Sequence, residues 1–399
     1  MSINTLDWIS SERERMIALV EKWANINSGS THLSGLATQC DFLQSAFESL
    51  KGKSAILPVH PFKTISDTGE MTYQTLGSAL HIQKYPEAPI QIFLGGHMDT
   101  VFGKNHPFQQ TRRISPDQLL GPGVTDMKGG LVILLKVLEA YERSPFAGKI
   151  GWEVLINADE ELGSPGSAHL FAEIAGRKQF GLLFEPALPD GALVDARKGS
   201  LSVTVISTGK SAHVGRDFFS GKNALTGLAR FALKAETITN KEKGILLNIG
   251  RIQGGGAINQ VPDKGSLRLN IRIDNPSQQE EVLRKLKHFA QEETEVQIDL
   301  YEETKTPPKP FDPPMQRLFE AYAQCAKELE IPFASRPSGG TCDGNRLYAF
   351  GLPNLDTLGA VGGHIHTSEE YLDLNSLVER AKLSALFLFK LAQGDFKLC

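Results

Sequence analysis

The sequence predicts an α/β protein in which a mostly parallel-sheet domain carries an inserted ferredoxin-like (β-α-β-β-α-β) domain. Between residues 89 and 184, short apolar runs alternate with helical patterns, as in proteins with a parallel sheet. Residues 200–301 follow a separate pattern that is long enough to be a domain by itself. The proline-rich segment 307–314 ends it. We therefore expect a discontinuous main domain over 1–197 and 307–399 and an insertion over 198–306.

The first part of the main domain opens with two helices, predicted over 6–26 and 35–50 from apolar residues that recur every three or four positions. Strands and helices then alternate. Serine followed by proline is typical of a helix start, and a short apolar run that ends in glycine is typical of a buried strand. The expected elements are a strand over Pro89–Gly96, a helix over Gly129–Tyr141, a strand over Ile150–Ile156, a helix capped by Ser164 that extends to about Ala175, and a strand over Gly181–Phe184.

The insertion has its own order of elements. They are a strand with alternating residues over 201–205, a helix capped by Asn223 that extends to about Thr237, strands over Ile245–Ile252 and Leu267–Ile273, a helix capped by Ser277 that extends to about Gln291, and a strand over Val296–Leu300. Because side chains alternate along a strand, Arg268, Asn270 and Arg272 are expected to share its polar face.

After the proline-rich segment, the chain returns to the main domain. Apolar periodicity predicts a helix over Met315–Leu329 and a final helix over Leu377–Leu391. Between them, Asn354–Leu358 has the composition of a strand.

Composition and charge exclude several classes of protein. The chain has 399 residues, with 42 Lys and Arg against 46 Asp and Glu, a formal net charge of −4. No basic surface is therefore predicted for nucleic acid or a membrane. No apolar run approaches the roughly 20 residues of a membrane span, and the N-terminus does not have the pattern of a secretory signal. The four cysteines, one of them Cys399, have no CxxC spacing, so we expect reduced thiols and a cytoplasmic location.

Potential metal ligands follow the predicted strands at their carboxyl ends, where open α/β sheets build their sites. They are His97 and Asp99 in GGHMDT, Asp126 in GPGVTDMKGG, the acids Asp159, Glu160 and Glu161, then Glu185, and finally His364 and His366 in GGHIHTSEE. A solvated surface turn also explains several of these groups when each is taken alone. Together, their mixed imidazole and carboxylate ligands suit zinc, and also cobalt or manganese.

Five motifs occur in one order: GGHMDTV, GPGVTDMKGG, NADEELGS, FEPA and HTSEEYL. Through them the chain, from about residue 30 to its C-terminus, resembles the M20 family of dinuclear-zinc peptidases and deacylases, and within it the glutamate carboxypeptidases of the carboxypeptidase G type. The resemblance implies two divalent metal ions. It implies one ion on His97, Asp126 and Glu185, and the other on Asp126, Glu161 and His366.

The same resemblance assigns the remaining roles near the metals. Asp99 would hold the ring of His97, and Glu160 would be the general base. His366 is preferred to His364 as the last ligand, because a glutamate, Glu370, follows it four residues later as in the family.

The resemblance also implies which residues bind the substrate. It further implies that the insertion is a lid and dimerisation domain. His213 in GKSAHVG resembles a lid histidine that reaches the partner's active site, which implies a homodimer. Asn259 and Arg272 match positions that hold the substrate's free carboxylate, although Arg272 also fits the solvent face of a strand. Gly339 and Gly340 resemble a glycine loop along the substrate, and Cys342 stands where relatives often carry serine.

The first functional hypothesis is a metal-dependent hydrolase that cleaves an amide bond next to a free carboxylate, in particular a glutamate-type carboxypeptidase. Its substrate would be a small peptide or an N-acyl amino acid. The alternative is an N-acyl-amino-acid deacylase or dipeptidase with the same metal centre. A binding protein without hydrolysis would have lost Glu160 or a ligand, and this chain keeps all of them.

Overall fold

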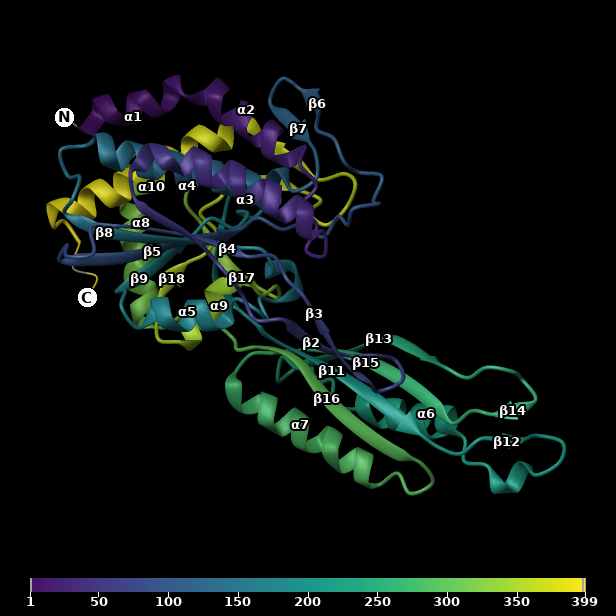
Figure 1. Ribbon diagram of the computed structural model, residues 1–399. Helices are drawn as coiled ribbons and strands as arrows, with labels where there is room; N and C mark the ends of the chain where they lie inside the picture. Colours follow the sequence, from purple (N-terminus) through teal and green to yellow (C-terminus); the bar gives the residue numbers. More distant parts are fainter. Residues whose placement is uncertain (1, 397, 399) are drawn as a thin grey trace.

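The computed structural model describes residues 2–396 and 398, and it divides into a main body and a smaller elongated unit (Figure 1). A six-stranded sheet organises the main body. Its order is β1 (Lys53–Leu57), β4 (Ala79–Lys84), β8 (Ile150–Asn157), β5 (Ile90–His97), β9 (Phe180–Leu183) and β18 (Asn354–Leu355). The pairings from β8 to β18 are parallel, whereas β4 is antiparallel to both β1 and β8.

The prediction of a mostly parallel sheet is confirmed in part. Three of its five pairings are parallel, and the sheet is mixed because β4 runs opposite to both of its neighbours. The strands predicted near residues 90, 150 and 181 are confirmed and form its parallel part. The antiparallel part comes from residues 53–84, for which no strand was predicted. The expected strand over Asn354–Leu358 is confirmed for only two residues, at β18.

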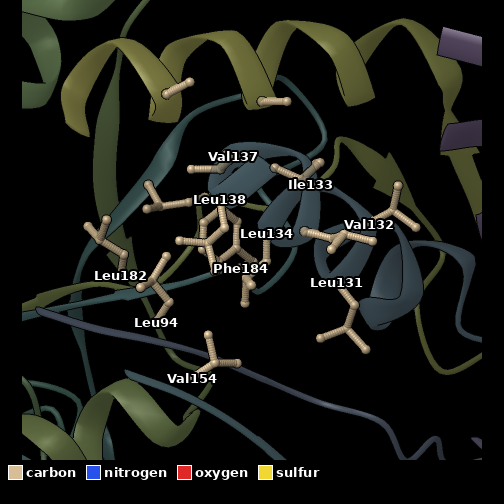
Figure 2. Close-up of a cluster of buried hydrophobic side chains, with 14 of the residues drawn as sticks. Leu94, Leu131, Val132, Ile133, Leu134, Val137, Leu138, Val154, Leu182 and Phe184 are labelled. Atoms are coloured by element: carbon tan, nitrogen blue, oxygen red, sulfur yellow. The ribbon is translucent and has the colours of Figure 1, made fainter. Parts of the chain in front are cut away.

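Helices cover both faces of the sheet. On one face, α4 (Gly130–Arg143) packs over Leu94, Val154 and Leu182, as Figure 2 shows. Also in this core are α1 (Ser2–Ser11), α2 (Arg13–Ala24), α3 (Leu33–Phe47), α8 (Pro313–Glu328) and α10 (Leu374–Gln393). The opposite face is covered by α5 (Ala168–Ala175) and α9 (Asp343–Ala349). Burial on both faces explains why the parallel strands are almost continuously apolar.

Three predicted helix starts or spans differ from the structure. The helix expected over 6–26 is two helices, broken at the buried Glu12, whose Oε2 accepts a hydrogen bond from Lys136 at 3.0 Å. Ser164 does not cap α5, because its backbone has φ of +53° and its side chain contacts Asn157 in the interior. Asn275, rather than Ser277, caps the helix α7, since Pro276 already occupies its first position.

The smaller unit is a four-stranded antiparallel sheet with two helices on one face. Its elements follow the chain as β11 (Gly199–Thr208), α6 (Ala224–Glu236), β13 (Leu246–Gly254), β15 (Lys264–Ile273), α7 (Pro276–Gln291) and β16 (Gln297–Thr306), and the sheet order is β13-β15-β11-β16. Asn223 caps α6, as predicted. The apolar face of β15 is buried under the helices, and Asn270 and Arg272 lie on the polar face.

Smaller elements connect these parts. A hairpin of β2 (Phe62–Ile65) and β3 (Met71–Gln74) extends from the main body and contacts the sheet of the smaller unit, where Arg268 donates to the carbonyl oxygen of Ile65 at 2.6 Å. The other short strands are β6 (Arg112–Ser115), β7 (Gln118–Leu120), β10 (Leu193–Arg197), β12 (Ala212–His213), β14 (Gln260–Val261), β17 (Ser335–Ser338), β19 (Gly362–Gly363) and β20 (Tyr371–Asp373).

Composition predicted reduced cysteines and no membrane-spanning segment. Cys40, Cys325 and Cys342 are buried and form no disulfide within the described residues, while Cys399 lies outside them. Across residues 2–396 and 398, we find no helix with the length and apolar character that crossing a membrane requires.

Candidate metal centre

The structure brings His97, Asp126, Glu161, Glu185 and His366 together at the carboxyl edge of the parallel strands. His97 is the last residue of β5. Asp126 lies in η2 (Val124–Gly129), the turn that leads into α4, where its own backbone is not helical. Glu161 lies in the short helix η3 (Glu160–Leu162) after β8, and Glu185 follows β9. His366 lies in the loop between β19 and β20. Each residue therefore leaves a different element at the same edge.

Asp126 lies between the two histidines. The Nε2 atom of His97 is 3.1 Å from Oδ1 of Asp126 and 3.6 Å from Oε2 of Glu185. The Nε2 atom of His366 is 3.2 Å from Oδ2 of Asp126 and 3.1 Å from Oε2 of Glu161. One carboxylate thus contributes an oxygen to each of two groups of potential ligands.

The electrostatics of this cluster favour a bound cation. Burial, and then the charge of Asp126, raises the pKa of Glu161 to about 7. Burial also raises the pKa of Glu185, whose Oε1 is buried without a hydrogen-bond partner. Hydrogen bonds with Asp126 and Glu161 raise the pKa of His366 to about 10. Carboxylates that share a site repel one another in this way unless positive charge compensates them.

The donor set fits a divalent metal ion. Ligand atoms of His97, Asp126 and Glu161 all lie within 4.8 Å of one another. Imidazole nitrogen and carboxylate oxygen are ligands of zinc, and Glu185 adds an unpartnered oxygen beside them.

Asp99 supports both the histidine and the glutamates. Its Oδ1 lies 3.3 Å from Nδ1 of His97, and its backbone carbonyl oxygen lies 3.1 Å from the same nitrogen, which leaves Nε2 directed at Asp126. The backbone N–H groups of Glu160 and Glu161 donate to the two oxygens of Asp99, each at 3.2 Å. A second contact that the sequence did not predict comes from Ser30, whose hydroxyl donates to Asp99 at 2.7 Å. A single buried carboxylate therefore orients ligands from two strands.

Glu370 explains why a glutamate follows His366. The carboxylate of Glu370 is buried and accepts hydrogen bonds from the backbone N–H groups of Gly123, Thr125 and Asp126, at 2.9–3.0 Å. It therefore fixes the turn that carries Asp126. His364 instead lies near the ring of Tyr371, with 5.9 Å between the ring centroids. Of the two histidines, His366 is the one that contacts Asp126 and Glu161 in the described structure.

Two cavities meet at this cluster, with Glu160, Glu161 and His366 in the walls of both. The first has a volume of about 320 Å³ and is also lined by Arg272, Gly340 and Cys342. The second has a volume of about 290 Å³, and its further wall includes Glu185, Arg197 and the apolar residues Ala187, Leu188, Val194 and Ile365. Burial, followed by the charge of Glu185, raises the pKa of Glu160 well above its ordinary value.

The predicted substrate residues are divided between two places. Arg272 and Gly340 line the first cavity, whereas Gly339 is exposed beside it. His213 and Asn259 lie together at the far tip of the smaller unit, where the N–H of Val214 donates to the carbonyl oxygen of Asn259 at 3.0 Å (Figure 1). Within one chain, the structure therefore does not bring His213 and Asn259 to the metal cluster.

Arg346 also lines the first cavity, and sequence analysis missed it. It lies on α9, outside the five motifs, so no pattern in a single sequence indicates it.

A carboxylate and histidine cluster of this kind, at the carboxyl edge of an α/β sheet and open to two cavities, defines a candidate metallohydrolase. The family model "Peptidase family M20/M25/M40" matches residues 93–390. The chain therefore belongs to the M20 peptidase family and is a metallopeptidase-type hydrolase, which confirms the resemblance found in the motifs.

Similar proteins agree with this assignment. Carboxypeptidase G2 of Pseudomonas sp. (strain RS-16) is 26% identical over 396 residues, covering 96% of this chain and 91% of that protein. The probable succinyl-diaminopimelate desuccinylase of Staphylococcus aureus (strain MRSA252) is 29% identical and covers 66% of this chain and 68% of its own length. A tripeptidase structure from Staphylococcus aureus has a TM-score of 0.75 at 20% identity, over 96% of this chain and 99% of that one, which shows a shared fold.

Proposed function

We propose that this chain hydrolyses an amide bond next to a free carboxylate, as a glutamate-type carboxypeptidase. The observation that carries the proposal is one cavity that contains both Glu160, beside the metal cluster, and the guanidinium of Arg272. Relatives named carboxypeptidase and desuccinylase support a hydrolase that acts on small substrates. A deacylase or dipeptidase would use the same cluster, and the cavity walls would then select a different acyl group.

The proposed centre holds two divalent cations, zinc in the first instance, with cobalt or manganese as substitutes. His97, Asp126 and Glu185 would bind one, and Asp126, Glu161 and His366 the other. When bound, such cations polarise a carbonyl and lower the pKa of water.

The chain's own residues would then divide the remaining work. Glu160 would take a proton from the attacking water and deliver it to the leaving nitrogen. Asp99 would keep Nε2 of His97 directed at the cluster, as its present contact with Nδ1 indicates. Arg272 would orient the substrate by binding its carboxylate with two parallel hydrogen bonds.

A substrate screen tests this proposal. Metal-stripped protein is supplied with zinc, cobalt or manganese in turn and assayed on N-acyl amino acids and dipeptides, each paired with its C-terminal amide. We expect hydrolysis of the free acids after metal addition and much weaker hydrolysis of the amides. Absence of hydrolysis with every metal and substrate would refute the proposal.

Arg272→Ala is expected to raise KM for substrates with a free carboxylate and to change the thermal unfolding temperature little. The side chain is half-buried and its one recorded hydrogen bond is a long one, 3.4 Å to Oγ1 of Thr341, so few contacts within the protein are lost. Steady-state kinetics on an acid and its carboxamide analogue measure the effect. The role assigned to Arg272 is wrong if the wild-type enzyme cleaves both analogues equally well.

The second proposal for this site is a homodimer in which residues 198–306 act as a lid and His213 enters the partner's active site. It would explain why His213 and Asn259 lie at the tip of this unit, away from the cluster of their own chain. In that position His213 would donate a hydrogen bond to the oxyanion of the reaction.

Mixing two inactive variants tests this arrangement. A Glu160→Gln chain and a His213→Ala chain should recover partial activity together, because one of the two sites in a mixed dimer would contain both intact residues. The control is each variant mixed with itself. If mixed dimers form, as shown by differently tagged subunits, and no activity returns, His213 does not act across the interface.

A further inference from the structure

The arginines in the walls of the two cavities differ in how their charge is neutralised. Arg197, in the second cavity, lies against Asp356, with Nε and Nη2 at 2.8 and 3.0 Å from the two carboxylate oxygens. Within the described residues, Arg272 and Arg346 in the first cavity form no ion pair. The first cavity therefore holds two guanidinium groups without a counter-ion.

Arg272 is a desolvated charge. It lies half-buried on β15, and its recorded hydrogen bond is the long contact with the hydroxyl of Thr341. Burial lowers the pKa of Arg272, and no opposing carboxylate raises it. Taking a guanidinium out of water in this way costs free energy that a bound anion would return.

Arg346 is held at the cavity wall by one contact. Its Nη2 donates to the carbonyl oxygen of Gly163, directly after the short helix that carries Glu160 and Glu161. The other guanidinium donors of Arg346 have no recorded partner in the described part of the chain. The contact of Nη2 thus fixes the side chain of Arg346, and the other N–H groups of its guanidinium can donate to a ligand.

The acids in the same wall form no ion pair with these arginines within the described residues, and burial raises the pKa of Asp343, a rise that the charge of Arg346 only opposes. Glu160 and Glu161 belong to the proposed base and metal ligands. The third acid, Asp343, is buried, and its two oxygens already accept hydrogen bonds from Nδ2 of Asn157 at 2.9 Å and from the hydroxyl of Ser164 at 2.5 Å. The two guanidinium groups therefore keep N–H donors for a ligand with two negative groups.

We propose that Arg346 is a specificity-determining residue that binds a second carboxylate on the substrate, while Arg272 binds the first. This inference rests on the proposed function and deepens it, because it names the residue that selects a dicarboxylic amino acid as the leaving group. The planar guanidinium suits this task, since it binds a carboxylate through paired N–H donors. The preference for an acidic residue then depends on a side chain that lies outside the family motifs of this chain.

The test compares Arg346→Gln with the wild-type enzyme on an N-acyl-glutamate and the matching N-acyl-glutamine. Glutamine keeps a donor for the carbonyl oxygen of Gly163 but removes the charge. The inference predicts that kcat/KM for the glutamate substrate falls by at least about tenfold, the effect of losing a hydrogen bond to a charged group. The value for the glutamine substrate should stay nearly constant.

A merely structural role of Arg346 gives a different result. If the contact with Gly163 only supports the helix of Glu160 and Glu161, both substrates lose activity equally, and the inference is wrong. Arg346→Lys keeps the positive charge and should keep part of the preference for glutamate. Arg336→Gln is the matched control, because Arg336 pairs with Asp190 at 2.7 Å outside both cavities and should change neither substrate.

The wild-type enzyme separates this inference from the function on which it rests. Hydrolysis of N-acyl amino acids without preference for glutamate over glutamine overturns the role of Arg346 and the glutamate preference. It leaves standing the proposed hydrolysis of an amide bond next to a free carboxylate. Failure to hydrolyse any of these substrates with any of the three metals overturns both.

Discussion

Glu160→Gln should leave the metal content of the protein unchanged and lower kcat by at least about 100-fold, the usual effect of losing a general base. Glutamine has the shape of glutamate but cannot accept the proton of the attacking water. The backbone N–H of Glu160, which donates to Asp99, is unaffected by the change. Metal analysis and steady-state kinetics on the same preparation measure both quantities.

The neighbouring residue is the matched control for this prediction. Glu161 lies 3.1 Å from Nε2 of His366 and is assigned to a metal, so Glu161→Gln should reduce metal content as well as activity. The two variants differ by one position in the chain and should differ in metal content. The division of roles is wrong if Glu160→Gln has a near-normal rate, or if it loses metal as Glu161→Gln does.

Asp126→Asn should remove more activity than Glu160→Gln, because it should remove bound metal. Burial alone would raise the pKa of Asp126, but its hydrogen bonds with His366 and His97 hold it below its ordinary value, so the native residue is a charged carboxylate. Asparagine keeps the shape of the side chain but supplies no charge to either histidine. Metal analysis after dialysis against metal-free buffer, followed by an activity assay, measures the effect.

Asp99→Asn provides a graded comparison. Asp99 contacts Nδ1 of His97 and is not itself expected to bind metal. The Asp99→Asn change should therefore weaken metal affinity by about 10–100-fold, as for other residues that orient a ligand.

For the Asp126→Asn variant, full retention of the bound metal would show that Asp126 is not the shared ligand.

Part of the candidate site could be expected because His97, Glu161 and Glu185 follow strands whose positions have a strong signal. Asp126 and His366 follow no predicted strand and were assigned from the resemblance. The strand before His97 is buried on both faces, and its apolar run is therefore almost unbroken. The carboxyl ends of neighbouring parallel strands must meet, so residues far apart in the sequence could be expected at one place. His366 was distinguished from His364 by the position of Glu370, and the contacts of Glu370 with the turn of Asp126 give the physical reason.

The parts of the fold that were missed have weak local signals. Residues 53–84 supply the edge strand β1 and its neighbour β4, and β1 is largely exposed, so no apolar run marks it. The break between α1 and α2 depends on the pairing of Glu12 with Lys136, a residue 124 positions away. The apparent helix start at Ser164 failed because its side chain hydrogen-bonds in the interior with Asn157 and Asp343 instead of capping the helix.

Arg346 shows the same limit for function. A lone arginine on a helix is most often a solvated residue, and only the folded chain shows that it shares a cavity with Glu160 and Arg272. Tertiary structure, rather than spacing in the sequence, therefore determines which cations remain without a partner.

We propose that Asp126 lies between two metal ions. Crystals grown with zinc, with anomalous diffraction recorded on either side of the zinc absorption edge, test it most directly. We expect two anomalous peaks in each chain, one among His97, Asp126 and Glu185 and the other among Asp126, Glu161 and His366. A single peak, or peaks away from these side chains, would contradict it.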